Sequence, residues 1–252
     1  MTALPAHRPI IGIWQHLPLP MISRYLALMG WDWVIVDMQH SAFDVETAYE
    51  CLHVLDSAGA VPILRSGVGQ PSQVERALDL GARGVVVPMV NSAAEAAIMA
   101  GAAKYPPLGR RSMGSDAAWH HGPDYFERAN AESLLLVQIE HIDAVGDVEA
   151  IMATPGVDGC FIGPTDLAMS MGLGRSGYEN HPLFRGAIAR TLAAAHARGK
   201  LACANCYTMA DAQEKIGQGF DCITFKSEAD LLVSAGKELL GQLRAAAGKT
   251  AG

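Results

Sequence analysis

Short runs of β-branched and other apolar residues recur along the chain, and segments with helical periodicity lie between them. Eight runs qualify as strands: 10–14, 33–37, 61–65, 85–88, 134–140, 159–163, 201–205 and 222–225. Within each run the apolar residues are continuous rather than alternating, which is typical of parallel strands covered on both faces. The pattern therefore predicts repeated strand–helix units.

The intervening helices are predicted over 23–30, 45–59, 71–81, 93–104, 184–199 and 229–246. Four of the helical segments stop at a glycine, the residue that most readily adopts the left-handed conformation beyond a helix end: Gly30, Gly59, Gly81 and Gly199. Eight units joined by right-handed crossovers favour an α/β fold, a single-domain (β/α)8 barrel over 1–252. A doubly wound open sheet is the alternative, but no G-x-G-x-x-G follows the first strand. The last helix, about 228–246, is expected to take part in oligomer packing.

The segment 104–133 does not fit this alternation. It is rich in proline, glycine, arginine and aromatic residues and is longer than an ordinary connection. We expect an irregular, functional loop here. Its adjacent His120 and His121 remain candidates for chemistry, whereas His53, within a predicted helix, is expected to be structural.

Composition narrows the functional class. With 50% hydrophobic and 18% charged residues, the chain is far from the composition of disordered proteins. A net charge of -7 without a run of lysine or arginine argues against nucleic acid or an anionic membrane as partner. No apolar stretch reaches the roughly 18 residues of a spanning helix, and the first residues do not resemble a secretory leader. We expect a cytoplasmic protein that acts on a small molecule.

The five cysteines are an odd number in a chain without secretory features, which favours free, buried thiols over disulfides. Cys203 and Cys206 form one C-x-x-C pair. A redox or zinc role for this pair is the less favoured alternative, because a second pair is absent and Cys203 falls within an apolar strand.

In a (β/α)8 barrel the chemistry lies at the carboxyl ends of the strands, where this chain carries Asp37, Arg65, Glu140 and Asp166. Strand alternation places Gln138 and Glu140 on one face, pointing inward. Because neighbouring strands lie about 4.8 Å apart, Glu140 and Asp166 can converge above the barrel. Two carboxylates without histidine or cysteine ligands suit Mg²⁺ or Mn²⁺. Pairing of Glu140 with Arg65, and helix capping by Asp166, are the alternatives.

Three further features belong to the same end. Gly163, Pro164 and Thr165 precede a helical pattern, so their backbone amides either bind a substrate carboxylate or only begin the helix. Arg65 shares a face with apolar residues, and a buried guanidinium needs an anionic partner or ligand. His40 follows the second strand and is a candidate proton carrier.

Five motifs stand in order at these positions: WDWVIVDMQH, VPILR followed by ALDLGARGVVVPMV, KYPPLGRRSMG, LLVQIE and GVDGCFIGPTDLAMSMG. In this combination the chain resembles the HpcH/HpaI family of metal-dependent, class II 2-oxoacid aldolases. The similarity runs from about residue 12 to the last strand.

The resemblance implies that Glu140 and Asp166 ligate a divalent metal, with Mg²⁺ or Mn²⁺ expected before Co²⁺ or Zn²⁺. It also implies that Arg65 contacts the keto or enolate oxygen. The substrate-binding group is then completed by one side chain on the fifth strand and the backbone after the sixth: Gln138, Gly163, Pro164, Thr165 and Asp166.

For proton transfer, the resemblance implies a role for His40, and Asp37 is placed with it among the catalytic candidates. It further implies that Asp79 reaches the corresponding histidine of a neighbouring subunit, and that the assembly is a homo-oligomer, a hexamer built as a dimer of trimers. Asp79 ends the third helix, at the opposite end of its own barrel, which agrees with a role in another subunit's site.

The chain departs from the family pattern at Gln39, where glutamate is common, at His141, where threonine is frequent, and at Ser112, where glycine is frequent. None of these departures removes a metal ligand. They affect the charge of the site and its choice of substrates.

The predicted reaction is reversible aldol cleavage and addition between an aldehyde and the enolate of a pyruvate-type 2-oxoacid, either pyruvate or hydroxypyruvate. The nearest rival is a class I aldolase that forms a Schiff base on Lys226, which follows the last strand. A non-catalytic barrel that binds a 2-oxoacid is the alternative from another functional class.

Overall fold

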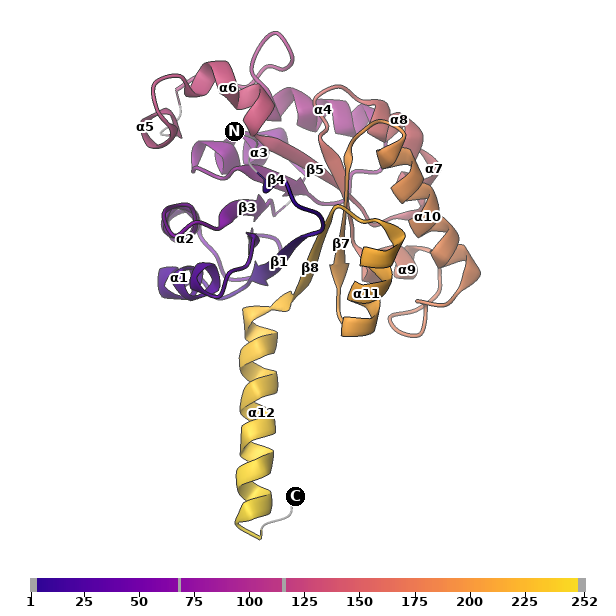
Figure 1. The fold of residues 1–252 in the computed structure, drawn as a ribbon. Helices are drawn as coiled ribbons and strands as arrows, with labels where there is room; N and C mark the ends of the chain where they lie inside the picture. Colours follow the sequence, from indigo (N-terminus) through magenta and orange to yellow (C-terminus); the bar gives the residue numbers. More distant parts are fainter. Residues whose placement is uncertain (1–3, 68, 115–116, 249–252) are drawn as a thin grey trace.

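Eight parallel strands close into a barrel, in which each strand pairs with its neighbour in sequence and β8 pairs with β1 (Figure 1). This computed structural model describes residues 4–67, 69–114 and 117–248. The strands are β1 (Ile10–Gln15), β2 (Trp33–Asp37), β3 (Val61–Arg65), β4 (Gly84–Val87), β5 (Leu134–Ile139), β6 (Gly159–Ile162), β7 (Leu201–Cys206) and β8 (Cys222–Ser227). The predicted (β/α)8 barrel is confirmed, and the open sheet is wrong.

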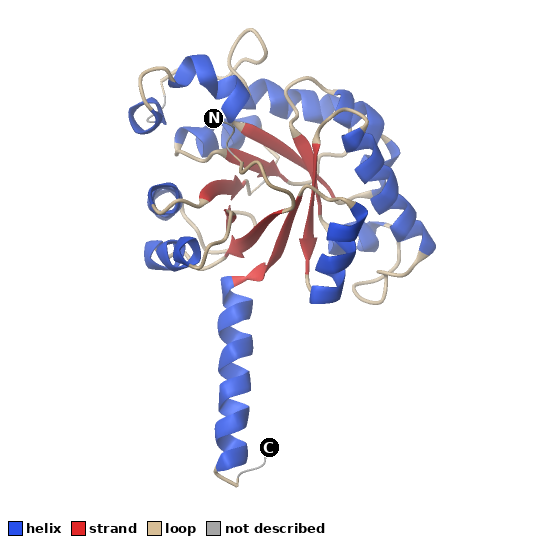
Figure 2. Ribbon diagram, in the orientation of Figure 1, coloured by secondary structure: helices blue, strands red, loops and turns tan. Residues whose placement is uncertain are grey.

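Helices surround the strands as an outer layer (Figure 2). In chain order they are α1 (Pro20–Leu28), α2 (Val45–Ser57), α3 (Pro71–Asp79), α4 (Ala93–Ala103), α5 (Ala117–His121), α6 (Tyr125–Glu132), α7 (Ile142–Gly146), α8 (Val148–Ala153), α9 (Pro164–Ser170), α10 (Pro182–His196), α11 (Met209–Gln218) and α12 (Glu228–Ala246). The four glycines predicted to stop helices all have positive φ: Gly30, Gly59, Gly81 and Gly199.

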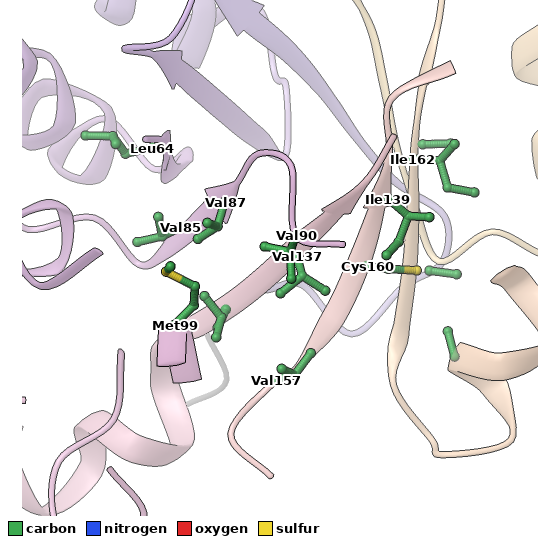
Figure 3. Packing of buried hydrophobic residues seen from close by; sticks show 14 of the residues in the cluster. Leu64, Val85, Val87, Val90, Met99, Val137, Ile139, Val157, Cys160 and Ile162 are labelled. Atoms are coloured by element: carbon green, nitrogen blue, oxygen red, sulfur yellow. The ribbon is translucent and has the colours of Figure 1, made fainter. Parts of the chain in front are cut away.

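Strand side chains alternate between two buried layers. One layer fills the barrel interior and includes Trp33, Leu136 and Phe161. The other joins strands to helices, and Figure 3 shows Val137 and Met99 among its members. Because both faces are buried, the strands need apolar residues at nearly every position, which explains the continuous runs in the sequence.

Gly12 on β1 makes room for the largest side chain of the barrel interior. A Cβ atom added at Gly12 would lie 2.0 Å from Cδ1 of Trp33, which is fully buried and donates a hydrogen bond to the carbonyl oxygen of Ile223 at 3.2 Å. Gly12 pairs with Trp33 in the β1–β2 register. The absence of a side chain at residue 12 therefore lets the indole of Trp33 pass over β1 and reach Ile223 on β8.

Residues 104–133 are more ordered than the sequence indicated, since α5 and α6 lie within them. Buried Lys104 anchors the segment. Its Nζ donates hydrogen bonds to the carbonyl oxygens of Asn130 and Ser133 at 3.1 and 2.6 Å, and it pairs with Asp158 at 2.8 Å. A buried ammonium group has to satisfy its donors in this way. The sequence pattern missed these helices because each is short.

The last helix, α12, projects away from the barrel (Figure 1). It begins with a capping box, in which Ser227 and Asp230 bond each other's backbone N–H groups. Beyond its first turn it is exposed, including apolar Leu232, Leu239 and Leu243, which are 60 to 68% exposed. Among the residues that the structure describes, no helix has the length and apolar character needed to cross a membrane.

We predict that Gly12→Ala lowers the free energy of unfolding by about 3 kcal/mol, because the added methyl group overpacks the interior against Trp33. Urea denaturation measures this change. The matched control is Gly236→Ala in exposed α12, where nothing lies within 4 Å of the added Cβ. That variant should be stabilised by about 0.5 kcal/mol. Equal effects of the two substitutions would contradict the assigned packing.

Candidate active site

A cavity of about 220 Å³ opens at the carboxyl ends of the strands. It collects residues from seven of the eight strand ends or the loops that follow them. They are Trp14, His16, Asp37, His40, Arg65, Gln138, Phe161, Gly163, Pro164, Thr165, Asp166, Asn205, Tyr207, Lys226, Ser227 and Asp230. Most of the residues singled out from the sequence are thus brought together, as expected for a barrel whose functional groups lie at this end.

Arg65 and Asp37 form a two-pronged ion pair within the cavity. Nε and Nη2 of Arg65 donate to the two carboxylate oxygens of Asp37 at 2.9 and 2.7 Å. The guanidinium carbon lies 4.4 Å from the ring centroid of Trp14, a cation–π arrangement. The anionic partner that buried Arg65 requires is therefore Asp37, and the alternative pairing with Glu140 is not seen. Within the described residues, no acceptor takes Nη1 of Arg65.

Asp37 also organises the loop that carries His40. Its Oδ1 accepts hydrogen bonds from the backbone N–H groups of Gln39 and His40 at 3.0 and 3.3 Å, and Nε2 of His16 lies 3.4 Å from Oδ2. Burial alone would raise the pKa of Asp37, but the hydrogen bond and charge of Arg65 outweigh it and hold that pKa below its ordinary value. Asp37 is therefore an anion whose oxygens are already occupied.

Glu140, directly after β5, points inward as predicted. Its Oε1 accepts a hydrogen bond from the backbone N–H of Met89 at 2.9 Å, and its Oε2 accepts one from Nε2 of Gln138 at 2.5 Å. Glu140 packs directly against the backbone of Gly163, where a Cβ would lie only 2.6 Å from Oε2 and would displace the carboxylate. Burial raises the pKa of Glu140, and the negative charge of Asp166 adds to the increase. The two carboxylates thus repel each other unless a proton or a cation lies between them.

These groups fit a divalent cation. Oε1 of Gln138 is buried, and no donor among the described residues reaches it. A buried carbonyl oxygen without a partner is costly, so this atom, on the side chain that also bonds Glu140, indicates a place for a ligand. The donors are carboxylate and amide oxygens, the set that Mg²⁺ and Mn²⁺ prefer. Glu140 and Asp166 are the residues that could hold the ion.

The start of α9 lies at the same edge. Gly163 is the N-cap of the helix, Pro164 and Thr165 open it, and Asp166 stands in its first turn, where no backbone N–H of the described residues bonds its carboxylate. The Thr165 hydroxyl lies 3.2 Å from that of Tyr207, which follows β7. Helix capping by Asp166 is therefore wrong, and unpaired backbone N–H groups remain at this terminus.

Three aromatic residues of the cavity, Trp14, Phe161 and Tyr207, were not identified from the sequence. Trp14 Nε1 donates to Asn205 Oδ1 and Thr224 Oγ1, each at 3.0 Å, so the indole is fixed at the cavity floor. Trp14 shares an alternating face with Gly12 and Ile10 in the interior. The same reasoning that placed Gln138 and Glu140 inward could have found it.

Asp79 lies away from this cavity, at the end of α3. Its Oδ1 accepts a hydrogen bond at 2.7 Å from Nη2 of Arg111, whose side chain is buried against the ring of Tyr105. His141 caps the start of α7, where its Nδ1 accepts a hydrogen bond from the backbone N–H of Asp143. Neither residue contributes to the cavity of its own chain.

The C-x-x-C residues do not form a joint site. Cys203 packs in the barrel interior and Cys206 in the outer layer, so the two thiols point to opposite faces of β7. Both are free and buried, and burial raises the pKa of Cys206 to about 12. Thiols held protonated in this way are poor metal ligands and poor nucleophiles.

Comparison with known proteins agrees with this arrangement. The family model described as HpcH/HpaI aldolase/citrate lyase matches residues 11–234. The chain belongs to the HpcH/HpaI aldolase/citrate lyase family. The resemblance found in the five motifs is thereby confirmed. The matched range contains all eight strands of the barrel except Ile10, the first residue of β1.

Three members of the HpcH/HpaI family show how far the similarity extends. A hydroxypyruvate/pyruvate aldolase of Rhizorhabdus wittichii is 34% identical over 94% of this chain and 95% of its own length. A 5-keto-4-deoxy-D-glucarate aldolase of Klebsiella pneumoniae is 35% identical over 94% and 93%. The crystal structure of an HpcH/HpaI family protein from Burkholderia cenocepacia matches with a TM-score of 0.87 and 33% identity, covering 94% and 95% of the two chains.

We predict that Asp37→Asn lowers the free energy of unfolding by about 3 kcal/mol at pH 7, because it leaves Arg65 buried without its anion. The pKa of Asp37 is depressed in the folded state, so its contribution is complete above its ordinary pKa of about 4 and is lost as the pH falls below it. The difference between wild type and variant should therefore shrink below about pH 4.

Urea denaturation from pH 7 to pH 2.5 measures this difference. Glu127→Gln, at an exposed carboxylate of α6, is the control and should change stability by less than about 0.5 kcal/mol throughout. A gap between wild type and Asp37→Asn that stays constant with pH would show that the Asp37 charge does not stabilise the fold.

Proposed function

We propose that this protein is a class II aldolase that reversibly joins an aldehyde to a pyruvate-type 2-oxoacid, pyruvate or hydroxypyruvate. One observation carries the proposal: buried Glu140 bonds Gln138, whose Oε1 has no partner among the described residues, and Gln138 lines the same cavity as Asp166 and Arg65. The cation that the carboxylates would hold and the guanidinium of Arg65 are two positive charges that can stabilise the negative charge of an enolate. The aldolase names of the similar proteins support the same reaction class.

Glu140 and Asp166 would hold the divalent metal, which we propose to be Mg²⁺ or Mn²⁺, with Co²⁺ and Zn²⁺ as less favoured ions. When bound, the ion would polarise the 2-oxoacid and lower the energy of its enolate. Burial of Glu140 favours neutralisation of its charge, and a cation provides this without protonation.

The other residues would position substrate and move protons. Arg65, held in place by Asp37 and Trp14, would direct its free Nη1 at the keto or enolate oxygen. The N–H groups at the start of α9 and the Gln138 side chain would bind the substrate carboxylate. In cleavage, the C4 hydroxyl proton passes to His40, the C3–C4 bond breaks, and its electron pair forms the enolate. Asp37, with both oxygens occupied, would act as a positioning residue.

The two rival functions are not favoured. Lys226 lines the cavity and could be the nucleophile of a class I aldolase, but Schiff-base chemistry needs no divalent cation, whereas Glu140 and Asp166 form a ligand set that suits one. A non-catalytic barrel that binds a 2-oxoacid would have no use for His40, and the similar curated proteins bear the names of enzymes.

Removal of either carboxylate should abolish metal-dependent turnover. We predict that Glu140→Gln and Asp166→Asn lower kcat/KM for pyruvate with an aldehyde by about a thousandfold, since the ion contributes several kcal/mol to enolate stabilisation. Activity of chelator-stripped protein with Mg²⁺, Mn²⁺, Co²⁺ or Zn²⁺, and exchange of the pyruvate C3 protons, are measured together.

The matched control is Glu149→Gln, at a surface carboxylate paired with Arg190, which should keep wild-type activity and metal dependence. Full activity of Asp166→Asn after chelation would contradict the metal assignment. Borohydride trapping of pyruvate on Lys226 would instead support the class I rival, and metal-independent binding without C3 exchange would support the non-catalytic alternative.

We also propose a homo-oligomer, a hexamer built as a dimer of trimers. Both α12 and α1 carry exposed apolar residues, of which Leu239, Leu243 and Leu28 are 60 to 68% exposed, and such surface indicates an interaction site. A second subunit could cover the exposed apolar residues of both helices. The five reduced, buried cysteines suit the cytoplasm, which we propose as its location.

Asp79 would act across this assembly. It is a third exposed, and Arg111 occupies only one of its oxygens. We propose that the other oxygen orients His40 of a neighbouring subunit. Asp79→Asn should then keep metal affinity but lower kcat, because it removes only the charge that tunes the imidazole.

Co-expression of Asp79→Asn with His40→Ala tests the cross-subunit pair. Some sites would take His40 from one variant chain and Asp79 from the other, and activity should exceed the sum of the separate variants. A pair within one chain cannot be restored by mixing. Absence of recovery, with mixed oligomers demonstrated by differently tagged chains, would return Asp79 to a purely structural role with Arg111.

A further inference from the structure

A second group of metal-ligating side chains lies at the end of the barrel opposite the cavity. Asp56 is near the end of α2, and His120 and His121 end α5 in the long segment. One ligand atom from each of the three residues lies within 4.8 Å of the other two. Because α2 runs from the cavity end of the barrel to the opposite end, the group is far from the candidate catalytic carboxylates.

The contacts around His120 suit a ligand position. Its Nε2 lies 2.9 Å from Oδ2 of Asp56, and its Nδ1 lies 3.2 Å from Nδ1 of His53. When Nδ1 of His120 donates its proton to His53, Nε2 carries a lone pair directed toward the Asp56 oxygen. Metal-binding histidines are commonly oriented by such a hydrogen bond through the second ring nitrogen.

His121 provides the second imidazole. Its ring centroid is 4.7 Å from that of His120 and 5.5 Å from that of Tyr125, so packing limits its movement. Its Nδ1 is buried and has no hydrogen-bond partner among the described residues. A cation would satisfy lone pairs of both imidazoles and of the carboxylate at once, which proton sharing among these groups does not.

Arg83 is the positive charge in this group. Its Nε lies 3.1 Å from Oδ1 of Asp56 and its Nη2 lies 3.5 Å from Oδ2, so its closer contact is with the oxygen that faces away from His120. The guanidinium can thus remain on Oδ1 while Oδ2 binds an ion. A carboxylate held in this way by a second partner is usual among metal ligands.

We propose that Asp56, His120 and His121 form a second metal site, selective for Zn²⁺, that fastens α5 to α2. Two imidazole nitrogens and one carboxylate oxygen are a common zinc ligand set, with water as the fourth ligand. The oxygen donors at Glu140 suit harder ions instead. The site lies at the barrel end associated with stability, so its role is structural and independent of the proposed aldol reaction.

Zinc stoichiometry tests the proposal. Chelator-stripped wild type is equilibrated with Zn²⁺ and desalted, and bound zinc is measured by mass spectrometry. His121→Phe keeps the ring packing without the nitrogens, and Asp56→Asn removes the charge. Each of these two variants should bind about one zinc ion per chain fewer than wild type. The Glu140→Gln/Asp166→Asn double variant should still bind the zinc ion of the Asp56 group. Co²⁺ substitution should give the intense visible absorption of a four-coordinate site, lost in His121→Phe.

The matched control is His196→Ala, which removes another histidine near an aspartate, with Nε2 3.1 Å from Oδ2 of Asp221 but outside the group of three ligands. It should bind as much zinc as wild type. In the Glu140→Gln/Asp166→Asn background, zinc at a hundredfold excess over Kd should raise Tm by about 5 °C, and adding His121→Phe to that background should abolish the increase.

Two results would overturn the proposal. One is wild-type zinc content in both His121→Phe and Asp56→Asn, with each variant folded by circular dichroism. The other is loss of the equivalent only in the Glu140→Gln/Asp166→Asn double variant. Either result would make the group a hydrogen-bonded network that needs no ion, and neither would bear on the aldolase proposal.

Discussion

The paired charges of Asp37 and Arg65 at the barrel mouth set the arrangement of the groups around them. Removing both from water costs several kcal/mol each, and only close, multiple contacts offset that cost. Here they are a two-pronged hydrogen bond, two loop N–H groups on the carboxylate and the face of Trp14 on the guanidinium. The same contacts hold the His40 loop and orient Arg65, so the site's stability and its geometry depend on one pair.

That pair exists because of strand register. Asp37 and Arg65 are direct partners in the β2–β3 ladder, and both end their strands. The register in turn depends on how side chains fill the barrel interior. At Gly12, which has no side chain, the ring of Trp33 occupies that volume. Since a shift of one residue would reverse the faces of a strand, interior packing at one end of the barrel determines which polar groups meet at the other.

The two ends of the barrel have different chemistry. The carboxyl end combines oxygen ligands with a guanidinium and an open cavity, whereas the opposite end contains charged groups that join segments: Lys104 with Asp158, Arg83 with Asp56, and Arg111 with Asp79. The long segment 104–133 is fastened by the pairs of Lys104 and Arg111 rather than by a large apolar face. Its histidines therefore stand beside α2, where an ion could reinforce the same attachment.

The period of the apolar residues was enough to determine the eight strands, the glycine helix ends and the inward direction of Gln138 and Glu140, because these follow from local backbone geometry. The sequence also indicated that buried Arg65 needs an anionic partner, but it did not show which residue this partner is. Tertiary structure alone decided that this anion is Asp37, that Cys203 and Cys206 face apart in different layers, and that His120 and His121 meet Asp56. Such pairings join residues far apart in the chain, and they depend on register and on the path of one long segment, which no local period encodes.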